Sequence, residues 1–301
     1  MARYALVVGI TQYNSYSFQN LTKPARDAEA VARLLEERGG EDGKGFQKIV
    51  RLPEVWNDER GCPQVAANSV TKQDLVQGLR MFLEEAGRGE AVIYFSGHGF
   101  VVPDDLNQNR KQGYLVTSDS NTENIGTHGI SFESLNDFFR NSNLNSLVLL
   151  LDCCHAGSYL ERDLVEQTLT AFGSQKDYYL MAACRSTEKA YEGEPEQENS
   201  VFTAALLEGL AQERADKDGQ ISCDRLFDFI YKNQKLRNFG QQPIRLGLGG
   251  SITLVTYPIE NKEPAKLNRQ NPYQGLRAFD SAQANYFYGR DRVIRELLVR
   301  L

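Results

Sequence analysis

Short apolar runs that alternate with amphipathic segments are the feature that most constrains how this chain can fold. The run SLVLLLDCC at 146–154 is the most apolar, and it has the continuous hydrophobic pattern of a strand buried on both faces. Other strand-like runs lie at 4–10, 46–52, 91–97, 177–184 and 251–257, and helical periodicity covers 24–40, 71–87, 131–142, 200–211 and 223–236. This alternation predicts an α/β fold in which helices cover both faces of a mostly parallel sheet.

The composition of the sequence changes after Tyr257, which indicates a domain boundary. The stretch PIENKEPAKLNRQNP, from 258 to 272, is polar and carries three prolines, as linkers do. We therefore predict a main domain over 1–257, a linker over 258–270 and a further segment over 271–301. That last segment ends in RDRVIRELLVRL, which has the pattern of an amphipathic helix.

Composition excludes several classes of function. The net charge is −6, and no block of Lys and Arg interleaved with aromatics predicts nucleic-acid binding. No run approaches the roughly 20 apolar residues that span a bilayer, and the first apolar run is too short for a signal peptide, so we expect a cytoplasmic protein without membrane contacts. Five cysteines without CxxC spacing disfavour both a disulfide framework and a zinc site.

Two strand ends carry reactive groups. AVIYFSGHGF places His98 between glycines, and LVLLLDCCHAGS ends a strand at Cys154. Neighbouring parallel strands would bring the two side chains to one sheet edge, where an imidazole can activate a thiol and later protonate a leaving amine. The backbone N–H groups of Gly99 and Cys154 would then hold the oxyanion. From pattern alone, cysteines that merely fill the core remain the alternative.

The two motifs together resemble those of caspase and metacaspase cysteine peptidases, including bacterial orthocaspases. SGHG at 96–99 is followed about fifty residues later by DCCHAG at 152–157. LTKPARDA at 21–28 and CRSTEKAYE at 184–192, the latter followed by SVFTAALLEGL, are similar to two further family segments. The resemblance covers 1–257, with 1–170 like the larger subunit and 171–257 like the smaller one. It implies the caspase-hemoglobinase fold, with a six-stranded sheet between helices.

The resemblance also implies roles. Cys154 is the nucleophile, His98 the base, and Cys153 and His155 are structural. Asp27, Asp152 and Ser96 line the pocket for the residue before the cut, which in metacaspases is Arg or Lys. Asp152 lies two residues before the nucleophile and so shares its face of the strand. For Asp27 the alternative is an exposed charge near a helix N-terminus.

Three functions follow as hypotheses. The first is an endopeptidase acting on peptides or proteins with a basic residue before the cut. The second is a catalytically silent caspase-like module used for interaction, and the third an enzyme that cuts after acidic residues. The loops at 158–176 and 192–200 should flank the site, and Arg162 and Lys176 are hypothetical self-cleavage points.

No cofactor is identified. Many metacaspases need calcium, but ADKDGQIS at 215–222 fails as an EF-hand, because Arg214 and Arg225 fall where the loop needs carboxylates. Calcium thus stays open without an assignable site. NPYQGLRAFDSAQANYFYGRD at 271–291 resembles the opening of a STAND-type signalling ATPase, although GxxxxGK[ST] is absent from the chain. This implies a regulatory ATPase region in a longer parent protein; the alternative is a docking tail.

Overall fold

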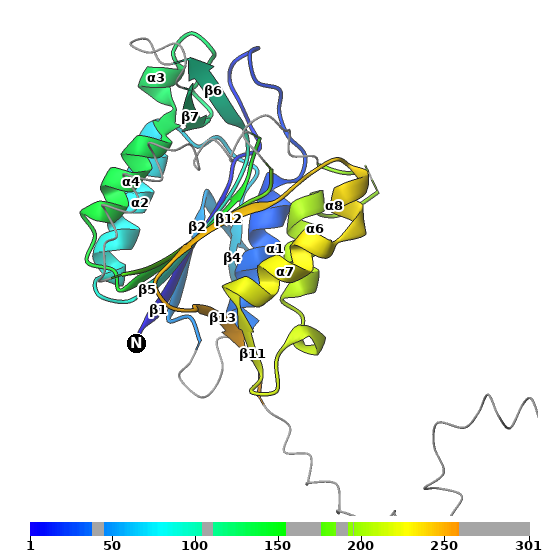
Figure 1. Cartoon of the computed structure of the whole chain (residues 1–301). Helices are drawn as coiled ribbons and strands as arrows, with labels where there is room; N and C mark the ends of the chain where they lie inside the picture. The colour runs from blue at the N-terminus through cyan, green and yellow to red at the C-terminus, as the bar shows by residue number, and fades with distance from the viewer. Residues whose placement is uncertain (38–44, 104–110, 155–175, 185–191, 195, 259–301) are drawn as a thin grey trace, which may run out of the picture. The chain divides into compact units, whose positions relative to one another are not determined.

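The computed structural model describes residues 1–37, 45–103, 111–154, 176–184, 192–194 and 196–258 (Figure 1). The chain divides into two units, Met1–Pro258 and Ile259–Leu301. The second unit lies outside the described residues, and so do the predicted linker beyond Pro258 and the predicted ATPase fragment.

A six-stranded sheet forms the centre of the first unit, in the order β12-β10-β9-β5-β1-β2. Five strands run parallel to one another: β1 (Arg3–Gly9), β2 (Lys48–Leu52), β5 (Glu90–Ser96), β9 (Ser146–Asp152) and β10 (Asp177–Ala182). The edge strand β12 (Ile244–Leu248) runs antiparallel to β10. The predicted mostly parallel six-stranded sheet is therefore confirmed.

The sixth strand is not the one that apolar runs indicate. The run at 251–257 does form a strand, β13 (Thr253–Thr256), but β13 pairs with β11 (Gln220–Ser222) in a separate two-stranded sheet. The central sheet takes β12 instead, where Ile244, Leu246 and Leu248 alternate with Arg245 and Gly247. Such alternation is the pattern of a strand at a half-covered edge.

Helices cover both faces of the sheet (Figure 1). On one face lie α1 (Pro24–Glu37), α6 (Val201–Gly209) and α7 (Cys223–Lys232), whose apolar side chains share a core with Ala5 and Val7 of β1. On the other lie α2 (Lys72–Ala86) and α4 (Phe132–Arg140), which pack with Leu6 and Val8. Successive residues of β1 thus pack into the cores on opposite faces of the sheet, because side chains alternate along a pleated strand.

Helix termini follow the polar signals in the sequence, with one exception. Thr71 and Asp74 form the expected capping box of α2, and Ser131 caps α4. The helix predicted at 223–236 is confirmed over Cys223–Lys232 (α7) but does not continue, because a second helix, α8 (Gln234–Asn238), follows it. Asn233 leaves the helical conformation between them, and its side chain accepts a hydrogen bond from the Lys235 N–H, which caps α8.

Shorter elements complete the unit. They are the hairpin of β3 (Glu54–Asn57) and β4 (Cys62–Val65), the small sheet of β6 (Gly99–Pro103), β7 (Lys111–Leu115) and β8 (Ile130–Ser131), α3 (Ile125–His128) and a 3-10 helix (Gln212–Arg214). The EF-hand-like stretch is a turn that leads into β11, in which the Asp216 carboxylate accepts the N–H groups of Asp218 and Gln220. Among the helices described, none has the length and apolar character to cross a membrane.

Candidate active site

The two motif turns meet at the carboxyl edge of β5 and β9. Ser96 and Asp152 are partners in the parallel register, and each ends its strand. Beyond them the Gly97 N–H lies 3.3 Å from the Asp152 carbonyl oxygen. A Cβ atom on Gly99 would lie 2.0 Å from the Cys154 carbonyl oxygen, so only glycine lets the two turns approach this closely.

A cavity of about 80 Å³ opens at this edge and collects the predicted side chains. It is lined by Leu21, Pro24, Asp27, Ser96, Gly97, His98, Asp152, Cys154, Glu192 and Ser200. All five side chains predicted for the site are among them. Sequence reasoning missed Glu192 and Ser200, although it placed the 192–200 loop beside the site; an acidic, polar loop gives no sign of which residues turn inward.

His98 is held in a defined orientation. Its Nε2 lies 2.8 Å from the Gln19 carbonyl oxygen, and since a carbonyl only accepts, Nε2 carries the proton and Nδ1 is the basic nitrogen. The His98 backbone N–H donates to the Tyr13 hydroxyl, which donates to the Ile10 carbonyl oxygen. Burial lowers the pKa of His98 below its usual value, against the opposing effect of the Gln19 hydrogen bond. The ring is therefore mainly neutral at pH 7.

The adjacent cysteines face different environments. Cys153 is fully buried in the core beneath α2 and α4, and this burial raises the pKa of its thiol well above the usual value. Cys154 is half-buried and lines the cavity. A buried thiol with a raised pKa is a poor nucleophile, so Cys154 is the one of the two placed to react. His155 lies outside the described residues.

Two carboxyl groups are buried at the cavity. Asp27 is fully buried, which excludes the exposed-charge alternative. Its Oδ1 accepts the Asn199 side-chain amide at 2.9 Å and the Ser200 N–H at 3.0 Å, whereas its Oδ2 has no hydrogen-bond partner among the described residues. Asp152 Oδ2 accepts hydrogen bonds from the hydroxyls of Ser200 and Thr203.

Both acids hold their protons more tightly than usual. Burial, and then repulsion by Asp152, raise the pKa of Asp27 to about 7. Burial also raises the pKa of Asp152, while its hydroxyl donors oppose the shift. Near neutral pH Asp27 is thus poised between its protonated and its ionised form.

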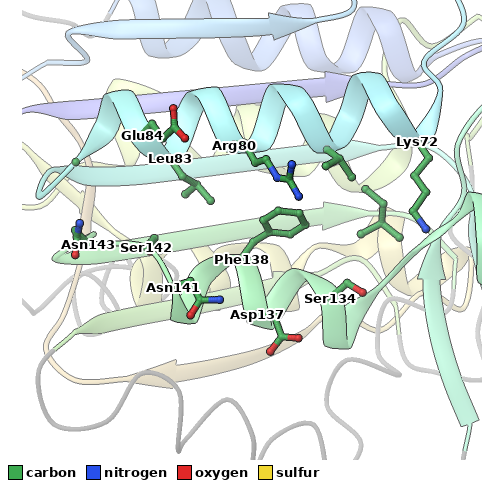
Figure 2. Close-up of a pocket in the computed structure, with 13 residues that line it drawn as sticks. Lys72, Arg80, Leu83, Glu84, Ser134, Asp137, Phe138, Asn141, Ser142 and Asn143 are labelled. Carbon is green, nitrogen blue, oxygen red and sulfur yellow. The ribbon is translucent and has the colours of Figure 1, made fainter.

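A larger cavity lies elsewhere in the described part of the chain. It has a volume of about 740 Å³ and lies between α2 and α4, on the opposite face of the sheet from α1 (Figure 2). In Figure 2 the Arg80 side chain extends toward the Phe138 ring, whose centre lies 5.8 Å from the guanidinium carbon. Its lining residues include no cysteine or histidine and none of the active-site residues, so size does not identify the reactive site.

One hypothetical self-cleavage point lies far from Cys154. Lys176 directly precedes β10, at the amino edge of the sheet, where its ammonium donates to the Ser142 carbonyl oxygen at 2.6 Å. Strand length separates the two edges by roughly 20 Å. In this conformation Lys176 therefore lies out of reach of Cys154. Arg162 lies outside the described residues.

Comparisons with known proteins agree with this architecture. The family pattern described as Caspase domain matches residues 2–243. Protein GSU0716 from Geobacter sulfurreducens has a similar fold, with a TM-score of 0.56 and 15% identity over 83% of this chain and 94% of its own. For caspase-1 from Spodoptera frugiperda the TM-score is 0.49 and the identity 13%, over 85% and 92%. No curated protein matches the sequence.

Proposed function

The chain belongs to the caspase-domain family, and on that premise we propose that it is a cysteine endopeptidase of the metacaspase type that cleaves after Arg or Lys. Cys154 and His98 form its catalytic dyad in this proposal. Asp27 and Asp152, with Ser96 beside them, receive the basic side chain that precedes the cut. The substrate is a peptide or protein.

The proposed reaction follows from the orientation of His98. Its basic Nδ1 takes the proton from Cys154, and the thiolate attacks the scissile carbonyl carbon. The N–H groups of Gly99 and Cys154 stabilise the oxyanion of the tetrahedral intermediate. The imidazolium then protonates the leaving amine, which leaves an acyl-enzyme thioester. A water molecule, deprotonated by His98, hydrolyses that thioester and restores the thiol.

The observation that carries the specificity is the state of Asp27. A buried carboxylate oxygen without a donor is costly, and Asp27 Oδ2, which has none among the described residues, belongs to a cavity that also contains the nucleophile and a second buried acid. A guanidinium or ammonium group entering the cavity would supply both the donors and the positive charge. An acidic side chain would add a further negative charge, so the same geometry disfavours cleavage after Asp.

The C-terminal segment bears on the biological setting. The resemblance of 271–291 to the opening of a STAND-type ATPase leads us to propose a role in bacterial signalling, cell death or defence, in the cytoplasm. The peptidase would then be controlled by a nucleotide-driven region of a longer parent chain. That segment lies outside the described residues, so its support is the sequence alone.

Fluorogenic peptides ending in Arg, Lys or Asp test the proposal. We expect the full chain to hydrolyse the Arg and Lys peptides and not the Asp peptide, with Cys154→Ala and His98→Ala reduced to background. Cys62→Ala is the matched control, because this half-buried thiol lies outside the cavity, in β4. Assays with and without calcium decide the metal question. Failure of wild type to cleave any of the three peptides, with calcium present, would support the silent interaction module instead.

A further inference from the structure

Lys23 is buried in an unusual way for a lysine. Only 2% of its surface is exposed, and it is the one buried lysine among the described residues. Its Nζ donates to the backbone carbonyl oxygens of Glu192, Glu194 and Asn199, at 2.5, 2.8 and 3.3 Å. An ammonium has three N–H donors, so the whole donor capacity of Lys23 goes to one segment of the chain, 192–200.

A side chain of the same segment also contacts the residues that precede α1. Glu192 Oε1 accepts the backbone N–H groups of Thr22 at 2.7 Å and Lys23 at 2.9 Å. These N–H groups directly precede Pro24, where α1 begins, and a carboxylate is favourable at this end of a helix. Two interactions therefore connect the 192–200 segment to the start of α1. The Lys23 ammonium binds backbone carbonyl groups of the segment, and the Glu192 carboxylate binds backbone N–H groups next to the helix.

The 192–200 segment forms part of the cavity wall. Glu192 and Ser200 line the cavity, and Asn199 and Ser200 donate hydrogen bonds to Asp27. Ser200 also donates to Asp152. The same short segment thus binds the Lys23 ammonium through its carbonyl groups and donates hydrogen bonds to both buried acids.

A buried ammonium costs more to desolvate than an apolar side chain of similar size. A methionine would fill the same space, but it could not orient three carbonyl groups. What the ammonium adds is a fixed course of the 192–200 backbone. We propose that Lys23 is a positioning residue that holds this backbone so that the cavity can accept a basic side chain. The inference rests on the proposed function.

The expected defect lies in recognition rather than in the reactivity of the thiol, since the hydrogen bonds of Lys23 lead to the segment and not to the dyad. Displacement of a positioning element by about 1 Å can cost on the order of a hundredfold in rate. For Lys23→Met we expect kcat/KM on an Arg peptide to fall by about tenfold to a hundredfold, mostly through KM.

Two thiol reagents separate recognition from reactivity in the full chain. Iodoacetamide carries no side chain for the cavity, whereas a peptidyl-arginine chloromethyl ketone does. The rate of labelling of Cys154 by each is followed by mass spectrometry of the peptide that contains it. In Lys23→Met the ratio of the arginine-reagent rate to the iodoacetamide rate should fall about tenfold or more, while the iodoacetamide rate stays within about twofold of wild type. Lys48→Met, which alters an exposed lysine paired with Glu85, should leave both rates unchanged.

The outcomes distinguish the two proposals. If wild type prefers the arginine reagent and folded Lys23→Met keeps the wild-type ratio, the positioning role is wrong and the proposed function stands. If wild type shows no preference for the arginine reagent over an aspartate reagent, the basic specificity is wrong and the positioning role fails with it. Should a thermal melt show Lys23→Met to be unfolded, Lys23→Gln, which keeps an N–H₂ donor in the same space, decides: we expect a lowered ratio, and an unchanged ratio overturns the inference.

Discussion

Replacing Asp27 by asparagine should change how the stability of the protein depends on pH. The pKa of Asp27 is raised from an ordinary 3.8 to about 7 by burial and by the neighbouring Asp152. The unfolded chain loses this proton near pH 4, whereas the folded chain keeps it until about pH 7. Between these values the folded state binds more protons than the unfolded state, so the free energy of unfolding falls as pH rises.

The size of the effect follows from the width of that window. One proton contributes about 1.4 kcal/mol per pH unit, so the rise from pH 5 to 7 should remove roughly 2–3 kcal/mol of stability from the wild type. The asparagine of the Asp27→Asn variant cannot lose a proton in this range. Its amide oxygen can still accept from Asn199 and Ser200, and its NH₂ group takes the place of Oδ2, which has no partner among the described residues.

Urea denaturation of wild type and Asp27→Asn at pH 5 and pH 8 measures the difference. The free energy of unfolding of the variant, relative to wild type, should increase by roughly 2–3 kcal/mol between the two pH values. Asp58→Asn, a change of an exposed carboxylate in the loop between β3 and β4, should show no such increase. Identical pH dependence in wild type and Asp27→Asn would refute the reasoning, because Asp27 would then be ionised in the folded state at pH 6.

Three further substitutions test separate parts of the structure. Gly99→Ala should reduce hydrolysis of an Arg peptide by on the order of a hundredfold, because its Cβ would lie 2.0 Å from the Cys154 carbonyl oxygen; an active variant would show that the two turns are not this close. Tyr13→Phe removes the hydroxyl between His98 and Ile10, and it should lower stability by about 1–2 kcal/mol and lower kcat more than it raises KM; unchanged kcat would argue against a role for Tyr13 in holding His98. Thr71→Ala removes the cap of α2 and should cost about 1 kcal/mol in a thermal melt while kcat stays the same; a fall in kcat would contradict the separation of this helix end from the site.

The sequence predicts the meeting of the two motif turns because local signals fix it. Each motif follows an apolar strand, and parallel neighbours in a sheet end at the same edge. The glycine at 99 then allows the close approach that the structure shows. The side on which Cys153 and Cys154 lie follows equally from the alternation of strand side chains.

What could not be predicted depends on contacts between distant parts of the chain. Glu192 and Ser200 lie at the cavity in a loop whose backbone binds the buried Lys23, about 170 residues earlier in the chain. The hydrophobic periodicity of a sequence does not predict such a contact. The edge strand β12 was missed for a different reason. Its apolar residues alternate with Arg245 and Gly247, so β12 lacks the continuous apolar run that predicts a buried strand.

The buried acids connect the stability of the folded chain to the binding of its proposed substrate. Without a ligand, ionisation of Asp27 destabilises the fold above neutral pH, because burial and the neighbouring Asp152 disfavour its charged form. A basic side chain in the same cavity would remove that penalty by supplying positive charge. Its binding would therefore stabilise the folded chain, and relief of the repulsion would contribute to the affinity. One substitution, Asp27→Asn, should therefore act in opposite directions, raising stability at pH 8 and lowering affinity for an Arg peptide. If the Asp27 carboxyl group only held α1 in place, Asp27→Asn would lower both the stability and the affinity. The sign of the stability change therefore separates a recognition role from a structural one.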